Sequence, residues 1–256
     1  QISDGISNST FQTRQLQQDY KDLQRRMLQG GNMEWEQQQL LQQLMQKQSD
    51  LQRQMEQVKK RFEEQTQQSQ QKQFSEDIRD KQQALKEQLD RLLDEELREQ
   101  MKKLEELMQR LNKDQAFKTM QQLEQENKLF NMDMQRIQEL MKQLEMQMRL
   151  EDMASKMEKL ADNQLELKDR TEQGKEDNAT LTKEQEQLKE QLDKAMKEDM
   201  KELQQLNGKM QQQQDMESAQ QQGKEAQQQM QESQDALEQD QKKKSGASQN
   251  KAAQNM

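Results

Sequence analysis

Apolar residues recur three and four positions apart along most of this chain, which is the spacing of one face of an α-helix. The pattern is most regular in residues 113–173, where it holds over several heptads and then slips by one residue after Met148. Sustained three-four spacing is typical of a coiled coil, and a phase slip marks locally altered supercoiling or a changed partner. The predicted interaction seam consists of Met120, Leu123, Asn127, Phe130, Met134, Ile137, Met141, Leu144, Met148, Met153, Met157 and Leu160.

One polar residue, Asn127, lies within the apolar part of this seam. A buried polar side chain at such a position often fixes the register or the number of helices in a coiled coil. Gln48 and Gln164 are polar members of seams elsewhere in the chain. We therefore expect Asn127 to fix the register or the number of helices in its seam.

Turn-forming clusters divide the seam pattern into segments. Breaks are expected at Gly30-Gly31, at Asn112–Asp114 and at Gly174–Asn178, and Thr182 with Gln185 forms a capping box that opens a further helix. The predicted segments are an irregular start plus a short helix (1–31), one or more coiled-coil helices (32–112), a long helix (113–173), a turn (174–181), a second long helix (182–240) and a disordered basic tail (241–256). Residues 65–73 lack the seam and are either a hinge or a solvated stretch of continuous helix.

The predicted fold class is all-α. A short turn at Asn112–Asp114 favours antiparallel neighbours on either side of it. We expect long coiled-coil helices arranged as antiparallel hairpins in an elongated bundle.

The composition changes this picture in one respect, because it limits how much core the chain can bury. Hydrophobic residues make up 29% of the chain, whereas about 45–50% is usual for a globular domain. That is too little for a large core and enough for thin seams. Disorder is the other interpretation of low hydrophobicity, but the chain has no Pro and only seven Gly among many good helix formers, which favours helix.

Catalytic and ligand-binding chemistry has little support in the sequence. The absence of His and Cys removes the commonest general base, thiolate nucleophiles and disulfides, and the many carboxylates alternate with Lys and Arg as on a solvated helix face. We expect no enzyme activity, no cofactor, no metal and no small-molecule substrate. The 20 Met residues raise the idea of a Cu(I) site, but Met134 and Met141 lie on the seam, where Met fills a core.

The charge pattern limits the possible partners. The net charge is −9 with both signs interspersed, so nucleic acid is not expected as a partner. The chain has no apolar run of membrane-spanning length and begins at Gln1 rather than Met, so we interpret it as a processed product or a piece of a longer protein. Any membrane anchoring is expected through segments outside this chain. The partners that we expect are other proteins, or further copies of this chain, bound through the coiled-coil seams.

Three stretches in the middle of the chain carry a resemblance. They are Asp80-Lys-Gln-Gln-Ala-Leu85 with Leu92-Leu-Asp-Glu-Glu-Leu97, the segment Leu104–Asp114, and Gln143-Leu-Glu145 with Lys156-Met-Glu-Lys-Leu-Ala161. The region from Met33 to Met210 resembles the helix-rich part of very large, membrane-anchored envelope proteins of Bacteroidetes-type bacteria, a family of unknown function. The resemblance implies an arm attached to the inner membrane and facing the periplasm, and it supplies no functional residues. The chain departs from the family in its heavy use of Gln and Met and in lacking the family's N-terminal membrane helices.

Three functions remain open at this point. The first is a structural or scaffolding arm that spans distance and presents helix faces to protein partners. The second is a periplasmic holdase that binds unfolded clients through Met-rich helix faces. The third is the coiled-coil portion of a regulatory or lytic enzyme whose chemistry lies outside this sequence.

Overall fold

The computed structural model describes residues 2–29, 35–69, 72, 74–109 and 113–256. Every regular element in these ranges is a helix and none is a strand, so the predicted all-α class is confirmed. The chain divides into two compact units, Gln1–Leu144 and Glu145–Met256.

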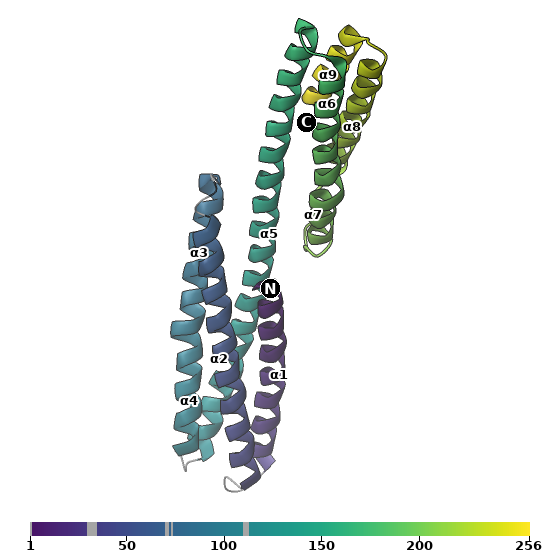
Figure 1. Cartoon of the computed structure of the whole chain (residues 1–256). Helices are drawn as coiled ribbons and strands as arrows, with labels where there is room; N and C mark the ends of the chain where they lie inside the picture. The colour runs from purple at the N-terminus through teal and green to yellow at the C-terminus, as the bar shows by residue number, and fades with distance from the viewer. Residues whose placement is uncertain (1, 30–34, 70–71, 73, 110–112) are drawn as a thin grey trace. The chain divides into compact units, whose positions relative to one another are not determined.

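The first unit is built from helices that follow one another along the chain (Figure 1). They are α1 (Ile2–Gln29), α2 (Trp35–Ser69), α3 (Glu76–Arg91), the π-helical segment η1 (Leu92–Leu97), α4 (Arg98–Gln109) and the first part of α5 (Lys113–Gln173). In η1 the backbone widens, and both Leu92 and Leu93 are buried. The π-helical segment therefore lies where the apolar spacing changes phase at Leu93.

Helices α1 and α2 pack along each other (Figure 1). The Nζ atom of Lys47 lies 2.6 Å from the carboxylate of Asp19. Near the other end, a Cβ added to Gly5 would lie 2.7 Å from Cγ2 of Val58, so glycine allows a close approach there. Early residues of α1 therefore meet late residues of α2.

Further polar contacts join the other helices of this unit. They link Gln82 to Ser69 and Lys86 to Glu63 between α3 and α2, Lys103 to Glu126 between α4 and α5, and Gln138 to Ser7 between α5 and α1. Between these contacts the seam residues of each helix are buried. Each helix thus covers the apolar face of a neighbour in the same unit.

The irregular start predicted within the segment 1–31 is wrong, because α1 already begins at Ile2. Ile6 is fully buried, as are the small polar residues that follow it on the same face. The hydroxyl of Thr10 donates to the carbonyl of Ile6 at 2.9 Å, and that of Thr13 donates to the carbonyl of Ser9 at 2.8 Å. These bonds satisfy polar groups inside a helix that composition alone assigned to a loop.

Three predicted interruptions fall wholly or partly outside the described residues, and Gly30-Gly31 lie outside them altogether. Helix α2 continues through residues 65–69 and α3 begins at Glu76, while residues 70, 71 and 73 lie outside the described residues. The first part of the predicted turn at 112–114 also lies outside them. Lys113 and the residue after it already belong to α5.

The second unit contains the rest of α5 and the helices that follow it (Figure 1). These are α6 (Asn178–Lys194), the π-helical segment η2 (Ala195–Asp199), α7 (Met200–Asn207), α8 (Glu217–Glu238) and α9 (Lys242–Asn255). Gly174 ends α5 with a φ of 66°, the left-handed conformation that glycine adopts without steric cost. A single cluster of apolar residues from α5, α6, α7, α8 and α9 forms the core.

The predicted turn at 174–181 is shorter in the structure. Helix α6 begins at Asn178, and the carboxylate of Asp177 caps it by accepting the backbone N–H of Thr180 at 2.7 Å. The capping box predicted at Thr182 and Gln185 therefore does not open this helix, since both residues lie inside α6. Asp is among the most favourable N-cap residues, and Asp177 precedes Thr182 in the chain, so the helix begins at the earlier cap.

The predicted helix 182–240 is not continuous. Helix α7 ends at Asn207, and the Asn207 side chain closes the following loop by donating to the carbonyl of Gln214 and accepting from its N–H, both at 2.8 Å. Helix α8 starts only at Glu217. The apolar spacing across this loop thus belongs to two separate helices.

The predicted disordered tail at 241–256 is also wrong. Residues 242–255 form α9, which packs along α8. Its buried face consists of small and amide side chains: Ser245, Gly246, Ser248, Gln249, Ala252 and Ala253. Because none of them is a large apolar residue, the sequence pattern gives no sign of a packed helix.

Candidate functional site

The predicted interaction seam lies along α5, and almost all of it is buried within the chain. Burial holds for Met120, Leu123, Asn127, Phe130, Met134, Ile137, Met141 and Leu144 in the first unit, and for Met153, Met157 and Leu160 in the second. Met148 differs, because it is only half-buried, while Met146 is fully buried in its place. The slip in the apolar pattern therefore begins before Met148.

The seam meets helices of the same chain. Met153, Met157 and Leu160 belong to one apolar cluster with Leu188 of α6 and Met230 of α8. In the first unit, α5 is joined to α1 and α4 by the polar contacts described above. The seam that the sequence predicts as an interaction surface is thus largely covered by other residues of the same chain.

A chain of buried polar side chains crosses the first unit. The Tyr20 hydroxyl of α1 donates to Oε1 of Gln48 on α2 at 3.4 Å, and Nε2 of Gln48 donates to Oε1 of Gln100 on α4 at 2.8 Å. Burial raises the pKa of Tyr20, and the nearby carboxylates of Glu126 and Asp19 raise it further. Tyr20 is therefore a neutral hydrogen-bond donor throughout the physiological range.

Asn127 has a different environment. Its side chain is fully buried, and neither amide atom has a hydrogen-bond partner among the described residues. An unpaired buried amide destabilises the fold, whereas a paired one specifies a particular arrangement.

A larger buried network, here called the polar layer, crosses the second unit. It consists of Gln164 and Thr171 of α5, Gln185 of α6, Ser233 of α8, and Ser245 and Gln249 of α9. Gln164 and Gln185 exchange two amide hydrogen bonds, at 2.8 and 3.0 Å. The Oε1 atom of Gln185 also accepts from Ser233 at 2.9 Å and from Gln249 at 3.1 Å. One residue of α6 thus joins all four helices.

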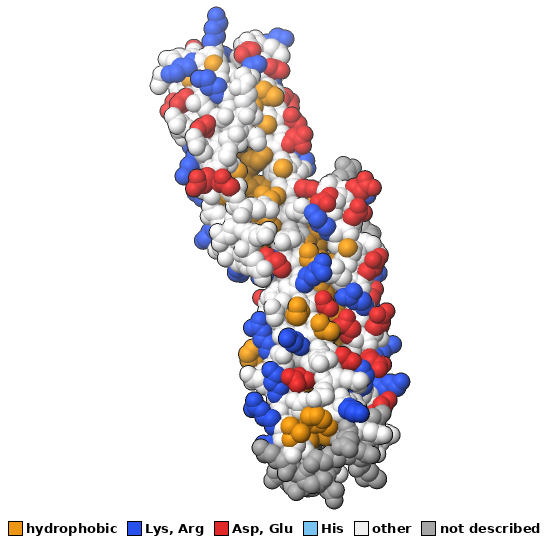
Figure 2. Space-filling model, turned by 180° about the vertical axis from the view of Figure 1, so that it is seen from behind, with side chains coloured by type: hydrophobic (Ala, Val, Ile, Leu, Met, Phe, Trp, Pro, Cys, Tyr) orange, Lys and Arg blue, Asp and Glu red, His pale blue; other side chains and the backbone are white. Residues whose placement is uncertain are grey.

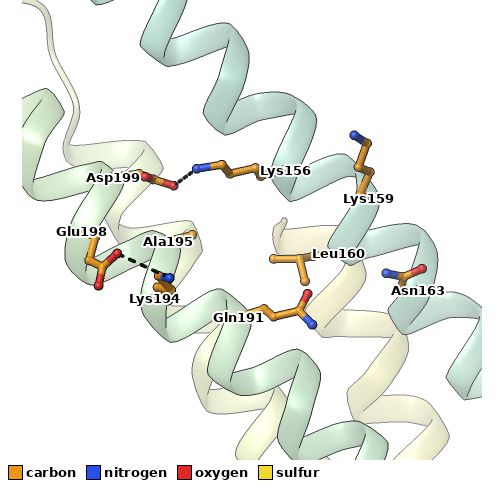
Figure 3. Close-up of a pocket in the computed structure, with 9 residues that line it drawn as sticks. All are labelled: Lys156, Lys159, Leu160, Asn163, Gln191, Lys194, Ala195, Glu198 and Asp199. Atoms are coloured by element: carbon orange, nitrogen blue, oxygen red, sulfur yellow. Dashed lines mark hydrogen bonds and ion pairs between the residues drawn. The ribbon is translucent and has the colours of Figure 1, made fainter.

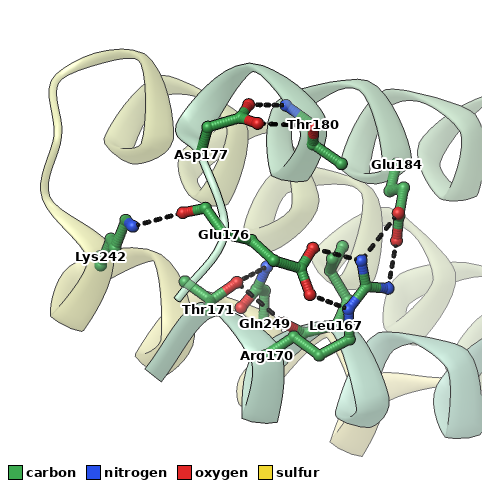
Figure 4. A network of polar contacts seen from close by, with 9 residues as sticks. All are labelled: Leu167, Arg170, Thr171, Glu176, Asp177, Thr180, Glu184, Lys242 and Gln249. Carbon is green, nitrogen blue, oxygen red and sulfur yellow. Dashed lines mark hydrogen bonds and ion pairs between the residues drawn. The ribbon is translucent and has the colours of Figure 1, made fainter. Parts of the chain in front are cut away.

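A charged network lies beside this layer, where α5 turns into α6 (Figure 4). The Arg170 guanidinium donates to Glu176 from Nε at 2.7 Å and to Glu184 from Nη1 at 2.6 Å. These bonds raise the pKa of Arg170 and lower that of the Glu176 carboxyl. Lys242 of α9 donates to the backbone carbonyl of Glu176 at 2.8 Å, so the same turn also holds the start of α9.

A groove of about 490 Å³ runs between α5 and the α6–η2 segment (Figure 3). Leu160 and Ala195 provide its apolar surface. Lys156 on one wall pairs with Asp199 on the other, with 2.6 Å between the charged atoms. Lys159 also lines the groove and forms no ion pair with any described residue. The groove can accept an apolar side chain with a carboxylate beside it.

The rest of the described surface is mixed in character. Figure 2 shows acidic and basic side chains interspersed over the visible face of each unit. Large apolar side chains are exposed at Phe11, Leu28, Leu129 and Met132, the last two 60% and 59% exposed and three residues apart on α5. Within the described ranges, no group of three or more carboxylates is arranged to hold a metal ion, and no helix is long and apolar enough to cross a membrane.

No protein-family model, no curated protein and no solved structure matches this chain.

Sequence reasoning missed most of the polar layer and Gln100. A signal for two of these residues was present, because Gln100 lies between Leu97 and Leu104, and Gln185 lies between Leu181 and Leu188, at three-four spacing. Both occupy seam positions as polar members, as Gln48 and Gln164 do. Gln249 offered no such signal, since α9 has no apolar seam to mark its buried face.

Proposed function

We propose that this chain is a structural or scaffolding arm that mediates protein–protein interaction, and that its role is not catalytic. Its helices are arranged as antiparallel coiled-coil hairpins in this proposal. The observation that carries it is the burial of the α5 seam against helices of the same chain. A helix whose apolar face is already covered provides a stable rod and leaves its outer face for other proteins.

The buried polar residues support the same role. Amide pairs such as Gln164 with Gln185 are satisfied only when their helices are correctly aligned. An arm that presents fixed faces needs this alignment, whereas a flexible linker does not. The ion pairs between neighbouring helices, such as Lys47 with Asp19, favour the same pairing weakly because they are exposed.

Two surfaces are available for partners in this proposal. Leu129 and Met132 form an exposed apolar pair on the outer side of α5. The groove beside Leu160 and Lys159 is the second surface, suited to a partner segment with apolar and acidic side chains. Both surfaces are small, which fits a weak or transient contact that is repeated along a longer protein.

The resemblance to membrane-anchored envelope proteins gives the proposal a location. The arm would belong to a larger envelope protein, anchored through segments outside this sequence and facing the periplasm from the inner membrane. Nucleic acid and small-molecule substrates are not among its proposed partners.

The holdase alternative has less support. A holdase needs open apolar faces for unfolded clients, but the seam residues Met134, Met141 and Met153 are buried against the chain's own helices. Mixing the chain with an aggregating model client at near-equal molar ratio distinguishes the two roles. A scaffolding arm leaves client aggregation unchanged, and strong suppression would favour the holdase instead.

Site-specific photocrosslinking in the producing cell tests the scaffolding role directly. A photoreactive amino acid replaces Leu129 or Met132 in the exposed pair, and the exposed Gln187 on α6 serves as the control position. We expect the same discrete protein adducts from both positions of the pair and not from the control. Adducts that are absent, or that are identical at all three positions, would contradict the proposal.

A further inference from the structure

The turn between α8 and α9 contains no residue that prevents a helix from continuing through it. It consists of Gln239, Asp240 and Gln241, with no glycine or proline. Asp240 has a φ of 58°, and no other non-glycine residue in the described ranges has a positive φ. This conformation is sterically costly for residues with a Cβ, although Asp tolerates it better than most. The turn therefore carries a backbone cost at Asp240 that a continuous helix through these residues would not carry.

Helix α9 is held by contacts that bury little apolar surface. Its buried face contains no side chain larger than Gln249, and its apolar members are Ala252 and Ala253. Gly246 allows a close approach, because a Cβ there would lie 3.0 Å from Oε1 of Glu172 on α5. Apart from Ala252, Ala253 and the partly buried Met256, the side chains that this end of the chain buries are polar or glycine, so they contribute little hydrophobic free energy when α9 docks.

The specific contacts of α9 are polar and directional. The Ser245 hydroxyl is 2.9 Å from that of Ser233 on α8, and Nε2 of Gln249 is 3.3 Å from the Thr171 hydroxyl on α5 (Figure 4). Lys242 binds the Glu176 carbonyl in the turn before α6. These contacts define a docking site that recognises α9 by hydrogen bonding and close fit.

We propose that α9 exchanges between two copies of this chain. When Asp240 leaves its left-handed conformation, α8 and α9 join into one helix, and α9 of each copy docks against α5, α6 and α8 of the other. The occupant is a second copy because the same side chains make the same contacts from either chain. The exchange concerns self-association only, and it stands or falls independently of the proposed scaffolding role.

The conformation of Asp240 sets the balance between the closed and exchanged forms. The docked contacts of α9 are the same in both forms, so the forms differ mainly in the turn and in the entropy of association. A substitution at residue 240 that tolerates the left-handed region less well than Asp is expected to raise the equilibrium constant for opening one α8–α9 turn about tenfold. An exchanged dimer opens two turns, so its association constant rises by roughly a hundredfold.

Three variants test this dependence. Asp240→Ala disfavours the left-handed turn, whereas Asp240→Asn retains it. Asp240 also accepts a 2.7 Å hydrogen bond from Nδ2 of Asn178, and Asn178→Ala removes that bond without changing the turn residue. Light scattering after size-exclusion chromatography, over a range of concentrations, measures dimer formation. We expect much more dimer for Asp240→Ala than for the wild type, Asp240→Asn or Asn178→Ala, and equal amounts in all four proteins would overturn the proposal.

A disulfide trap shows whether such a dimer is exchanged. The chain has no Cys, so Ser233→Cys with Ser245→Cys introduces a single pair at positions whose hydroxyls are 2.9 Å apart. After oxidation with diamide, the exchanged Asp240→Ala dimer gives a covalent dimer on a denaturing gel. A dimer that yields only internally crosslinked monomer would overturn the proposal.

If Asp240→Ala loses its helical circular dichroism signal and therefore does not fold, the same disulfide trap is applied to folded variants. The Cys pair is then compared in the wild-type and Asp240→Gly backgrounds at high protein concentration, because glycine adopts the left-handed conformation of residue 240 without steric cost. A larger covalent-dimer fraction in the wild-type background is expected. Equal fractions in the two backgrounds would overturn the proposal.

Discussion

A buried polar side chain restricts how helices can pack, because its hydrogen bonds form only when its partners are in place. Gln185 is fully buried, and its one side chain bonds Gln164, Ser233 and Gln249. Leaving a buried polar group unpaired costs about 1–3 kcal/mol, which is more than a satisfied hydrogen bond contributes. The layer therefore penalises misaligned helices more than it stabilises the correct arrangement.

Removing Gln185 tests this penalty. Gln185→Leu leaves the buried Gln164 amide unpaired and removes one hydrogen bond each from Ser233 and Gln249, so we expect the free energy of unfolding, measured by urea titration, to fall by about 2–4 kcal/mol. The double variant Gln164→Leu with Gln185→Leu removes both members of the amide pair and is expected to lose less than the sum of the single changes. Gln191→Leu, at an exposed position of α6, is the control and should change stability by less than about 0.5 kcal/mol. Additive losses would show that the amide pair is not coupled.

Two carboxyl groups in the turn between α5 and α6 make the free energy of unfolding depend on pH. Arg170 lowers the pKa of the Glu176 carboxyl from its ordinary value of 4.5. Hydrogen bonds from Thr180 lower that of Asp177 from 3.8. Both groups bind fewer protons in the folded state, so their stabilisation is complete above the ordinary values and is lost as the pH falls through the depressed ones. Urea midpoints from pH 7 down to pH 3 should therefore decrease, with a shallower decrease in Glu176→Gln. Identical slopes for the two proteins would contradict the role of Glu176.

At the scale of the element, helix type was predictable and helix limits were not. The three-four apolar spacing marks buried positions such as Leu123, Phe130 and Ile137 without any knowledge of the fold. Helix ends depend on individual side-chain bonds, and these changed the outcome at Asp177 and Asn207. The sequence pattern did not predict helix α9 or the first turns of helix α1, because small and hydroxyl-bearing residues form the buried faces of both segments.

Close packing of α9 is open to a direct test. Gly246→Leu places a side chain where a Cβ alone would contact Glu172, and overpacking of this kind typically costs about 1–3 kcal/mol. We expect hydrogen exchange of the α9 backbone amides to become roughly ten to a hundred times faster. The exposed Ala247→Leu is the matched control on the same helix and should leave exchange unchanged. Equal protection of α9 in both variants would show that α9 is not held by this close contact.

At the scale of the whole molecule, the sequence identifies which faces are apolar but not which faces meet. A seam residue such as Met134 has the same spacing whether it packs against another chain or against its own. The difference lies in long-range pairings, including Gln48 with Gln100 and Gln185 with Gln249, which no local pattern encodes. The candidate partner surfaces follow from this outcome, because they are what remains exposed after the seams are covered.

The central claim is that one chain satisfies its own seams. It is tested most directly by measuring helical circular dichroism together with absolute mass by light scattering over a wide dilution series of the wild-type chain. The account predicts a predominantly monomeric protein whose helicity per residue is the same at the lowest and highest concentrations. A protein that is helical only as a dimer or larger assembly, and that loses helicity as it dissociates on dilution, would contradict it.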